Sequence, residues 1–161
     1  MAKKKSKKAA SKAAKKPAKK NAAKSAKKRA ATAKGPRAMS TGRGATPLEI
    51  GSRLVADFNA GKWELTDAWS KDLVSIEGLG VAMAWEGRRA VDEKNAWWAS
   101  THKVYGGRAE GPFVGATGFA VKFTIDVEDT TTGKRETMVE VGVYTVNNGK
   151  IIREEFMYFA G

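Results

Sequence analysis

Charged residues are segregated along this chain, and the segregation limits which part of it can fold. Residues 1–46 contain 17 Lys and Arg and no Asp or Glu. Residues 47–161 contain the other 13 basic residues and all 17 acidic ones, so their net charge is −4. The net charge of +13 therefore describes a strongly basic segment joined to a mildly acidic one, and each segment needs its own interpretation.

The basic segment has almost nothing to bury. It consists mainly of Lys, Ala, Ser and Gly, and its only large apolar residues are Met1 and Met39. Such a segment cannot offset the entropy of ordering its backbone, so we predict that residues 1–45 form a disordered Lys/Ala-rich basic tail. Its composition resembles that of linker-histone tails.

We expect this tail to bind polyanions such as DNA or RNA. Lys presents a point charge rather than a planar fork, and no aromatic residue is available for base stacking. Contacts would therefore be with phosphates, independent of sequence and sensitive to salt. The predicted nucleic-acid-binding residues are Lys3, Lys4, Lys5, Lys7, Lys8, Lys15, Lys16, Lys19, Lys20, Lys27, Lys28 and Arg29.

Two alternatives for the tail stay open. It could be a solubilising extension, with Met39 as the start of the part that folds. An anionic membrane is a less favoured partner, because no apolar anchor accompanies the charge.

The sequence also bears on location. No apolar region follows the basic stretch, as it would in a secretory signal peptide, and no run elsewhere approaches the length of a membrane span. The absence of Cys is compatible with a reducing compartment. We expect a cytoplasmic protein without membrane contact, and a nucleoid-associated one if the tail binds DNA.

Residues 46–161 suffice for one compact domain with a hydrophobic core. Thr46–Glu49 forms a capping box with Pro at the first helical position, which predicts a helix over residues 47–60. The following pattern predicts a helical piece over 63–70, a strand over 73–77 and an apolar loop over 78–85. A second long helix is predicted over 87–101.

The remainder of the chain has the pattern of strands. Apolar and polar residues alternate over 119–127 and again over 139–144. Asn148-Gly149 is a strong hairpin signal, with a return strand over 151–159. Helices followed by a run of strands predict an α+β fold, in which helices pack on one face of a curved antiparallel sheet.

Three elements in this order carry a family resemblance. They are the capped first helix, the strand Asp72–Glu77 leading through a loop to Trp85-Glu86-Gly87, and the hairpin Val143–Phe156. Together they resemble the SnoaL-like branch of the nuclear transport factor 2-like superfamily. The resemblance implies a cystatin-like cone, in which a bent antiparallel sheet is closed by helices. It leaves the activity open, because the superfamily includes isomerases, cyclases, epoxide hydrolases and proteins without catalysis.

Several kinds of site are not favoured by the residues available. One His and no Cys argue against zinc, and there is neither a Gly-x-Ser-x-Gly nucleophile elbow nor a phosphate-binding Walker sequence. Gly78-Leu79-Gly80 follows a strand but lacks the third glycine of a dinucleotide site. We expect no metal and no cofactor.

Carboxylates on the hairpin are the candidate catalytic residues. A two-residue turn at Asn148-Gly149 would pair Val143 with Glu154, placing this carboxylate on a stripe with Val139, Val141 and Val143. Desolvation there would raise its pKa, as a general acid or base requires. A three-residue turn would shift the pairing by one residue, so Glu140 and Glu155 stay as alternatives. A solvated or ion-paired sheet carboxylate, for example beside Arg153, is the competing interpretation.

Other candidates would line a cavity. Tyr144 could donate a hydrogen bond into it, as Tyr does in the ketosteroid isomerases of the superfamily. Predicted ligand-binding residues are Met83, Trp85, Trp98 and His102, of which His102 could instead simply end a helix. The other tryptophans, Trp63, Trp69 and Trp97, are expected in the core.

The favoured interpretation is that the domain binds a small apolar or amphipathic molecule and that the tail binds polyanions. One alternative is an acid/base enzyme of isomerase or hydrolase type. Another is a nucleic-acid-associated protein whose domain serves for dimerisation. We expect a homodimer through an apolar sheet face consisting of Met138, Val146, Ile151, Met157 and Phe159.

Overall fold

The structure is a computed structural model that describes residues 44–63 and 67–159. The chain divides into two units, residues 1–37 and 38–161, and the described residues all belong to the second. Residues 1–43 of the predicted tail lie outside the described residues, and with them its predicted disorder and its predicted nucleic-acid-binding residues.

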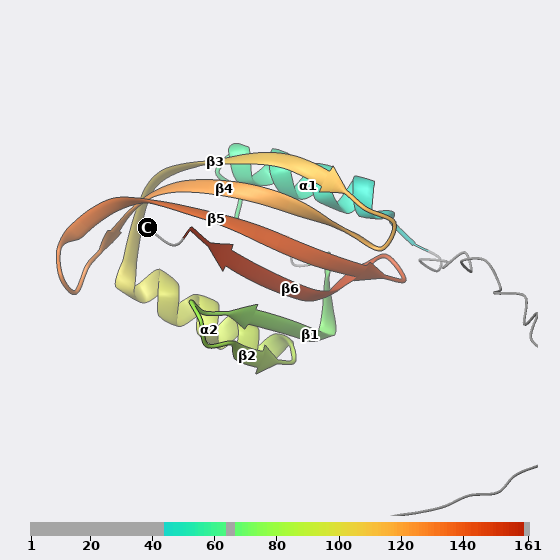
Figure 1. Cartoon of the computed structure of the whole chain (residues 1–161), viewed down its shortest axis with the longest axis horizontal. Helices are drawn as coiled ribbons and strands as arrows, with labels where there is room; N and C mark the ends of the chain where they lie inside the picture. The colour runs from blue at the N-terminus through green and yellow to red at the C-terminus, as the bar shows by residue number, and fades with distance from the viewer. Residues whose placement is uncertain (1–43, 64–66, 160–161) are drawn as a thin grey trace, which may run out of the picture. The chain divides into compact units, whose positions relative to one another are not determined.

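Two helices and six strands follow one another along the described chain. They are α1 (Pro47–Asn59), β1 (Trp69–Glu77), β2 (Met83–Glu86), α2 (Arg88–Thr101), β3 (His102–Val114), β4 (Gly118–Asp129), β5 (Lys134–Asn147) and β6 (Lys150–Tyr158). The strands form one sheet in the order β2-β1-β6-β5-β4-β3, which Figure 1 shows from bottom to top. The predicted α+β fold class is confirmed.

The sheet is mixed rather than wholly antiparallel. β1 runs parallel to β6, and each of the other four neighbouring pairs is antiparallel. A parallel neighbour requires a crossover connection, and here the chain between β1 and β6 makes β2, α2 and the other three strands. This crossover brings the early β1 beside the last strand of the domain, between β2 and β6.

The first helix forms where the sequence predicts it. Thr46 accepts a hydrogen bond from the Glu49 backbone at 3.2 Å, and Glu49 accepts one from the Thr46 backbone at 2.7 Å, which completes the capping box. At the other end, the Asn59 side chain donates to the carbonyl of Ala109 and accepts from its amide. The helix is thereby fixed against β3, which lies beside it in Figure 1.

Two predictions in the first half of the domain were wrong. Trp69 and Ser70 belong to β1 rather than to a helical piece, and residues 67–68 form a turn; residues 64–66 lie outside the described residues. The predicted loop over 78–85 contains the start of β2. In both places pairing with β1 or β6 decides the structure, and such tertiary contacts override local propensity.

Both helices cover the same face of the sheet, as predicted. Phe58 of α1 packs against Phe123 of β4, with ring centroids 4.9 Å apart, and Lys94 of α2 reaches Ser75 of β1. We call this the inner face. On β4 it consists of buried side chains at every second position: Phe119, Val121, Phe123, Ile125 and Val127. Among the described residues, no helix is long and apolar enough to cross a membrane.

Candidate active site in the cavity between helices and sheet

The hairpin of β5 and β6 decides which side chains face inward. Val146 pairs with Ile151 across the two-residue turn at Asn148-Gly149, as predicted. Ile152 is then left without a partner on β5, which makes a β-bulge. From this bulge to the end of β6, every pair is shifted by one residue from the predicted register, and such a shift exchanges the two faces.

The predicted stripe of valines with Glu154 was therefore wrong. Glu154 pairs with Tyr144, whereas Val143 pairs with Glu155 on the opposite face. The three-residue turn is excluded by the same pairing. The inner face of the two strands carries Met138, Glu140, Gly142, Tyr144, Glu154, Phe156 and Tyr158.

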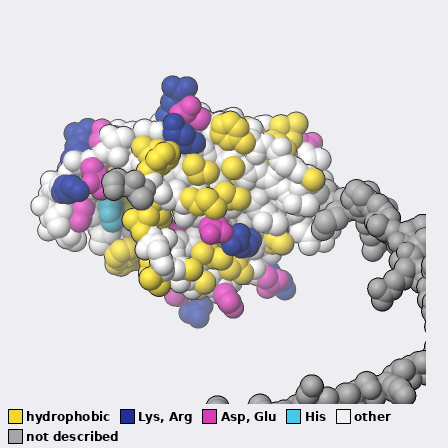
Figure 2. All heavy atoms as spheres, in the orientation of Figure 1, with side chains coloured by type: hydrophobic (Ala, Val, Ile, Leu, Met, Phe, Trp, Pro, Cys, Tyr) yellow, Lys and Arg dark blue, Asp and Glu magenta, His cyan; other side chains and the backbone are white. Residues whose placement is uncertain are grey.

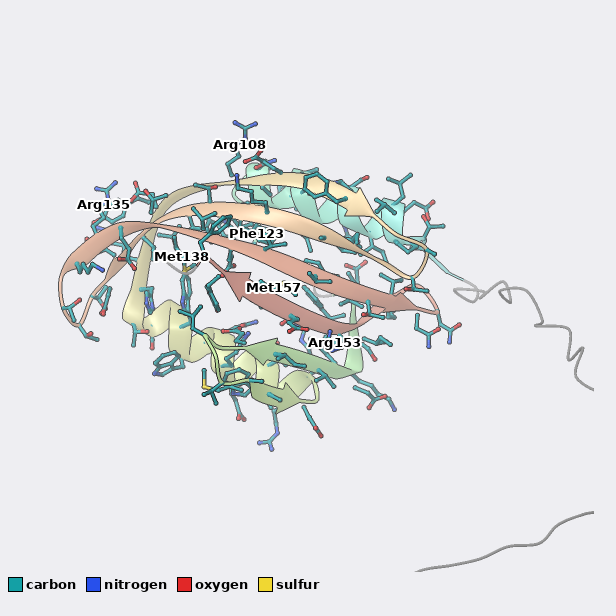
Figure 3. All side chains as sticks on the ribbon, viewed as in Figure 1. Arg108, Phe123, Arg135, Met138, Arg153 and Met157 are labelled. Atoms are coloured by element: carbon teal, nitrogen blue, oxygen red, sulfur yellow. The ribbon has the colours of Figure 1, made fainter. Side chains whose placement is uncertain are left out.

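The opposite side of the sheet is the outer face. Its residues on β5 and β6 are Val139, Val141, Val143, Thr145, Arg153, Glu155 and Met157. Of the apolar face that we predicted, only Met157 lies here. Val146 and Ile151 are buried in the core, and Met138 lines the cavity described next. Figure 3 labels Phe123 and Met138 from the inner face and Arg153 and Met157 from the outer face.

A cavity of about 1040 Å³ lies between the inner face and the helices. Its wall takes side chains from both helices and from every strand except β3. Trp63, Met83 and Trp97 are wall residues that are also exposed, so the cavity opens to solvent along an apolar rim. Figure 2 shows hydrophobic side chains exposed across the middle of the face seen in Figure 1. The volume suffices for a small organic molecule.

A buried cation stands in the wall. Lys94 of α2 has a side chain that is 10% exposed, and its ammonium forms an ion pair with Glu77 of β1. The same ammonium donates to the Ser75 hydroxyl at 3.1 Å and lies 3.9 Å from the Glu154 carboxylate. Because Lys94 approaches two carboxylates at once, it compensates part of their charge where its own side chain and that of Glu154 are little exposed to water.

Aromatic rings surround this ion cluster. The Lys94 ammonium lies 5.5 Å from the ring centroid of Trp85 and 5.3 Å from that of Phe156, which is the range of cation–π contact. Tyr158 donates a hydrogen bond to Glu77 at 3.0 Å. The wall can therefore hold an alkylammonium group between carboxylates and aromatic rings.

Glu140 differs from the other wall carboxylates. It is 8% exposed, and no group among the described residues donates a hydrogen bond to it or forms an ion pair with it. Burial raises its pKa to about 7, and the negative charge of Glu77 adds to the rise, whereas Lys94 opposes it. A carboxyl with a pKa near neutrality can give or take a proton at physiological pH.

The pKa of Glu154 is also set by burial and by neighbouring groups, but more of these groups lower it. Burial raises its pKa, while a hydrogen bond from Ser75 and the charge of Lys94 lower it. The two carboxyls thus lie on neighbouring strands with different partners. Such a difference allows them to hold protons over different pH ranges.

Tyr144 lies across Gly142 on the inner face. A Cβ atom on Gly142 would be 2.6 Å from the Tyr144 hydroxyl, so only glycine leaves room for this orientation. Phe119 stacks on the Tyr144 ring at 4.8 Å. Burial and the charges of Glu154 and Glu140 raise the tyrosine pKa well above its usual value, so the hydroxyl stays protonated.

The other predicted site residues are divided. Met83, Trp85 and Trp98 line the cavity. His102 is not among the wall residues; its ring stacks on Trp98 at 4.6 Å, and its Nδ1 lies 3.1 Å from the Trp98 carbonyl oxygen.

Two of the tryptophans expected in the core are exposed. Trp63 is 46% and Trp97 63% exposed, and both contribute to the rim.

Five residues of the site were missed in the sequence. They are Ser75, Glu77, Lys94, Gly142 and Tyr158. Two of them left a signal. Ser75 and Glu77 alternate with the apolar Val74 and Ile76, which is the pattern of a strand with one polar face. Lys94 left a weaker signal: it is three residues after Val91 and four before Trp98, which places it on the apolar face of the helix, although a lysine on a helix is most often solvated.

The donor set does not suggest a metal. Among the residues that the structure describes, no group of three or more His, Cys, Asp or Glu side chains could hold a metal ion. What the wall offers is carboxyl, phenol and ammonium groups in an apolar cavity. Such a set can bind a molecule with one polar end and can exchange a proton with it.

Comparison with solved structures supports this fold. A Mesorhizobium loti protein, provisionally assigned as a SnoaL-like polyketide cyclase and also as a carbohydrate phosphatase, is 37% identical to this chain, with a TM-score of 0.64. The alignment covers 71% of this chain and 100% of that one.

Similarity extends to more distant structures. A provisionally assigned isomerase from Rhodopseudomonas palustris is 17% identical, with a TM-score of 0.52, over 70% of this chain and 88% of that one. A provisionally assigned polyketide cyclase from Pseudomonas putida is 16% identical, with a TM-score of 0.54, over 72% of this chain and 93% of that one. No curated protein matches the chain. The model of the SnoaL-like domain matches residues 45–158, and the chain therefore belongs to the SnoaL-like domain family.

Proposed function

We propose that the domain binds a small amphipathic molecule in the cavity between the inner face and the helices. The observation that carries this proposal is an apolar cavity of about 1040 Å³ with the buried, unpaired carboxyl of Glu140 in its wall. Apolar cavities with a few convergent polar groups are the usual sites of small-molecule binding. An apolar rim and a charged interior suit a molecule whose polar end enters first.

Binding can be tested by filling the cavity. Met138 and Val139 are neighbours on β5 that face the cavity and the outer face respectively. Met138→Trp should weaken binding of the neutral fluorescent probe N-phenylnaphthylamine, whereas Val139→Trp should leave it unchanged. Fluorescence titration measures both, with melting curves to establish that each variant is folded. Equal probe binding by the two variants would place the probe elsewhere and contradict the proposal.

An acid/base enzyme is the second candidate, and the pKa of Glu140 favours it. A carboxyl with a pKa of about 7 can remove a proton from a bound molecule and return it elsewhere. Lys94 and the hydroxyls of Tyr144 and Tyr158 would stabilise negative charge that develops on that molecule. Solved structures similar to this chain are described as a cyclase and an isomerase, and enzymes of these kinds move protons.

Proton exchange provides a test that needs no natural substrate. In deuterated buffer the protein should accelerate loss of the α-protons of tetralone, a bicyclic ketone, as followed by NMR. Glu140→Gln should abolish the acceleration, and Glu155→Gln, on the outer face of β6, should not. Exchange at the buffer rate with the unmodified protein would count against catalysis and leave the binding proposal intact.

We propose a homodimer through the outer face, in place of the face predicted from the sequence, whose Met138, Val146 and Ile151 lie in the cavity wall or the core. The face combines the half-buried Val141 and Val143 with the exposed Met157. Two ion pairs, each with one positive and one negative side chain, flank these residues: Arg153 with Glu155 and Lys122 with Glu110. A two-fold axis would place apolar against apolar residues and allow each charge to meet its opposite.

We propose for the basic tail, residues 1–45, that it binds polyanions. Its 17 basic residues up to position 46, without one acid, support this. Affinity for duplex DNA should fall by roughly 0.9 log units per phosphate contact for each tenfold rise in salt. A chain beginning at Met39 should not bind, and binding that persists in that chain would place the nucleic-acid site in the domain.

A further inference from the structure

We infer that the ligand of the cavity is an organic cation, an amphipathic amine whose ammonium group binds beside Glu140. This inference rests on the proposed binding function and names the chemical class that the cavity selects. Three independent features of the wall support it: the balance of charges, the unpaired carboxyl and the aromatic rings.

The interior of the cavity has more carboxyl groups than cations. Glu77, Glu140 and Glu154 reach it from three neighbouring strands, and Lys94 is the cation that approaches two of them. The Arg88–Asp92 pair in the wall, at 2.7 Å, adds no net charge, and the third cation of the wall, Lys62, is exposed to solvent, so four carboxyl groups face three cations. A positive group on the ligand would therefore meet a negative potential.

Glu140 is the carboxyl that lacks a partner. Its residue is 8% exposed and lines the cavity, and it receives neither a hydrogen bond nor an ion pair from any described residue. No wholly buried side-chain oxygen of the described residues lacks a partner, so the Glu140 carboxyl keeps its small accessible surface toward the cavity. A buried carboxylate without a partner is destabilising, and a bound ammonium group would donate the missing hydrogen bond.

Aromatic side chains flank that position. Glu140 pairs across the sheet with Phe123 on one side and Tyr158 on the other, so their side chains lie beside it on the inner face. The chain already illustrates this mode of binding, because the Lys94 ammonium lies over Trp85 and Phe156 and against Glu77. A second ammonium from the ligand would repeat the arrangement one strand further along the sheet.

The protonation of Glu140 predicts how the affinity for the amine changes with pH. Glu140 must be ionised to attract the amine, and burial raises its pKa to about 7, so amine binding should strengthen as pH rises from 6 to 8. Amine binding near neutrality should also release protons from the protein. The charged and titratable groups that face Glu140 or line its cavity are the exposed Lys62 after α1, Glu77 on β1, Arg88, Asp92 and Lys94 on α2, Tyr144 on β5, and Glu154 and Tyr158 on β6.

Three probes of similar shape distinguish the outcomes: naphthylethylamine, naphthylethanol and naphthylacetate. At pH 8 the amine should bind at least about tenfold more tightly than the alcohol, because a buried hydrogen bond between charged groups adds that much, and the carboxylate should bind most weakly. Calorimetry in two buffers of different ionisation enthalpy should detect the released protons at pH 7.

Variants then assign the effect to one carboxyl. Glu140→Gln should remove the preference for the amine and its pH dependence while leaving alcohol binding unchanged. Glu155→Gln, a matched change on the outer face, should alter neither. Equal affinity for amine and alcohol, or an amine preference that survives Glu140→Gln, would overturn the inference alone. Failure of all three probes to bind would overturn it together with the proposed binding function.

Discussion

The two faces of the sheet carry the same kinds of charged residue in opposite circumstances. On the inner side, Lys94 of α2 and Glu154 of β6 have side chains that are 10% and 5% exposed, whereas on the outer face Arg153 and Glu155 are 40% and 32% exposed. Burial raises the pKa of Glu140, while a hydrogen bond from Arg135 lowers the pKa of Asp126 on the outer face. Location relative to the helices, rather than residue type, decides how a carboxyl of this sheet titrates.

The largest difference between the faces should appear when one member of an ion pair is removed. Lys94→Met leaves the buried Glu154 and the half-buried Glu77 without their cation, which should lower the free energy of unfolding by about 3 kcal/mol. Arg153→Met on the outer face should cost less than about 1 kcal/mol, because Glu155 keeps its access to water. Urea denaturation of both variants measures the contrast. Similar losses in the two would mean that the faces do not differ in dielectric environment.

A change at Glu140 should have the opposite sign. Its folded pKa of about 7 lies above the usual value of 4.5, so the folded state binds the proton more tightly and loses stability as pH rises through this range. Glu140→Gln removes that loss, and it should raise the free energy of unfolding above pH 7 by an amount on the order of 3 kcal/mol.

The pH profile is the decisive part of this measurement. The advantage of Glu140→Gln should shrink as pH falls from 7 towards 4.5 and should nearly vanish below that. Glu155→Gln serves as the control and should show no such trend. A Glu140→Gln protein that melts below the unmodified protein at pH 8 would refute the buried, unpaired carboxyl.

Packing on the inner face can be tested without any charge. Gly142→Ala would place a methyl group 2.6 Å from the hydroxyl of Tyr144, whose ring is held by Phe119 and Trp69, and should cost about 2 kcal/mol. Gly106→Ala on β3 adds the same group where nothing lies within 4 Å and should be nearly neutral. Thermal melting measures both; equal melting temperatures would show that Tyr144 can turn away from Gly142.

The smallest effect on stability is expected on the outer face. Met157→Lys changes a residue that is 50% exposed, so the folding of one subunit should change by less than about 0.5 kcal/mol. It should nevertheless separate a dimer formed through that face, as sedimentation velocity would detect. Thr131→Lys, in the exposed turn between β4 and β5, adds the same charge away from the face and should leave assembly unchanged. A dimer that survives Met157→Lys would move the interface elsewhere.

Local sequence signals were reliable where the structure depends on residues that are close together in the sequence. The capping box at Thr46 and Glu49 places the start of α1, and Asn148-Gly149 produces a two-residue turn between β5 and β6. Both rest on contacts between residues that are adjacent or nearly so. Alternation over β4 likewise identified its buried side chains, because period two is a property of any strand.

Register and burial of charge were decided by the tertiary structure. The bulge at Ile152 moves Glu154 from the side of Val143 to that of Tyr144, and β6 is paired on both edges, with β1 and β5. The bulge in β6 must be compatible with its pairing to both β1 and β5, and β1 lies far away in the sequence, so local sequence patterns do not predict it. The sequence by itself determined an α+β domain with carboxylates on its last two strands. Only the folded sheet, with both helices on one side, decided that Glu140 and Glu154 would line the cavity and that Glu155 would lie on the outer face, paired with Arg153.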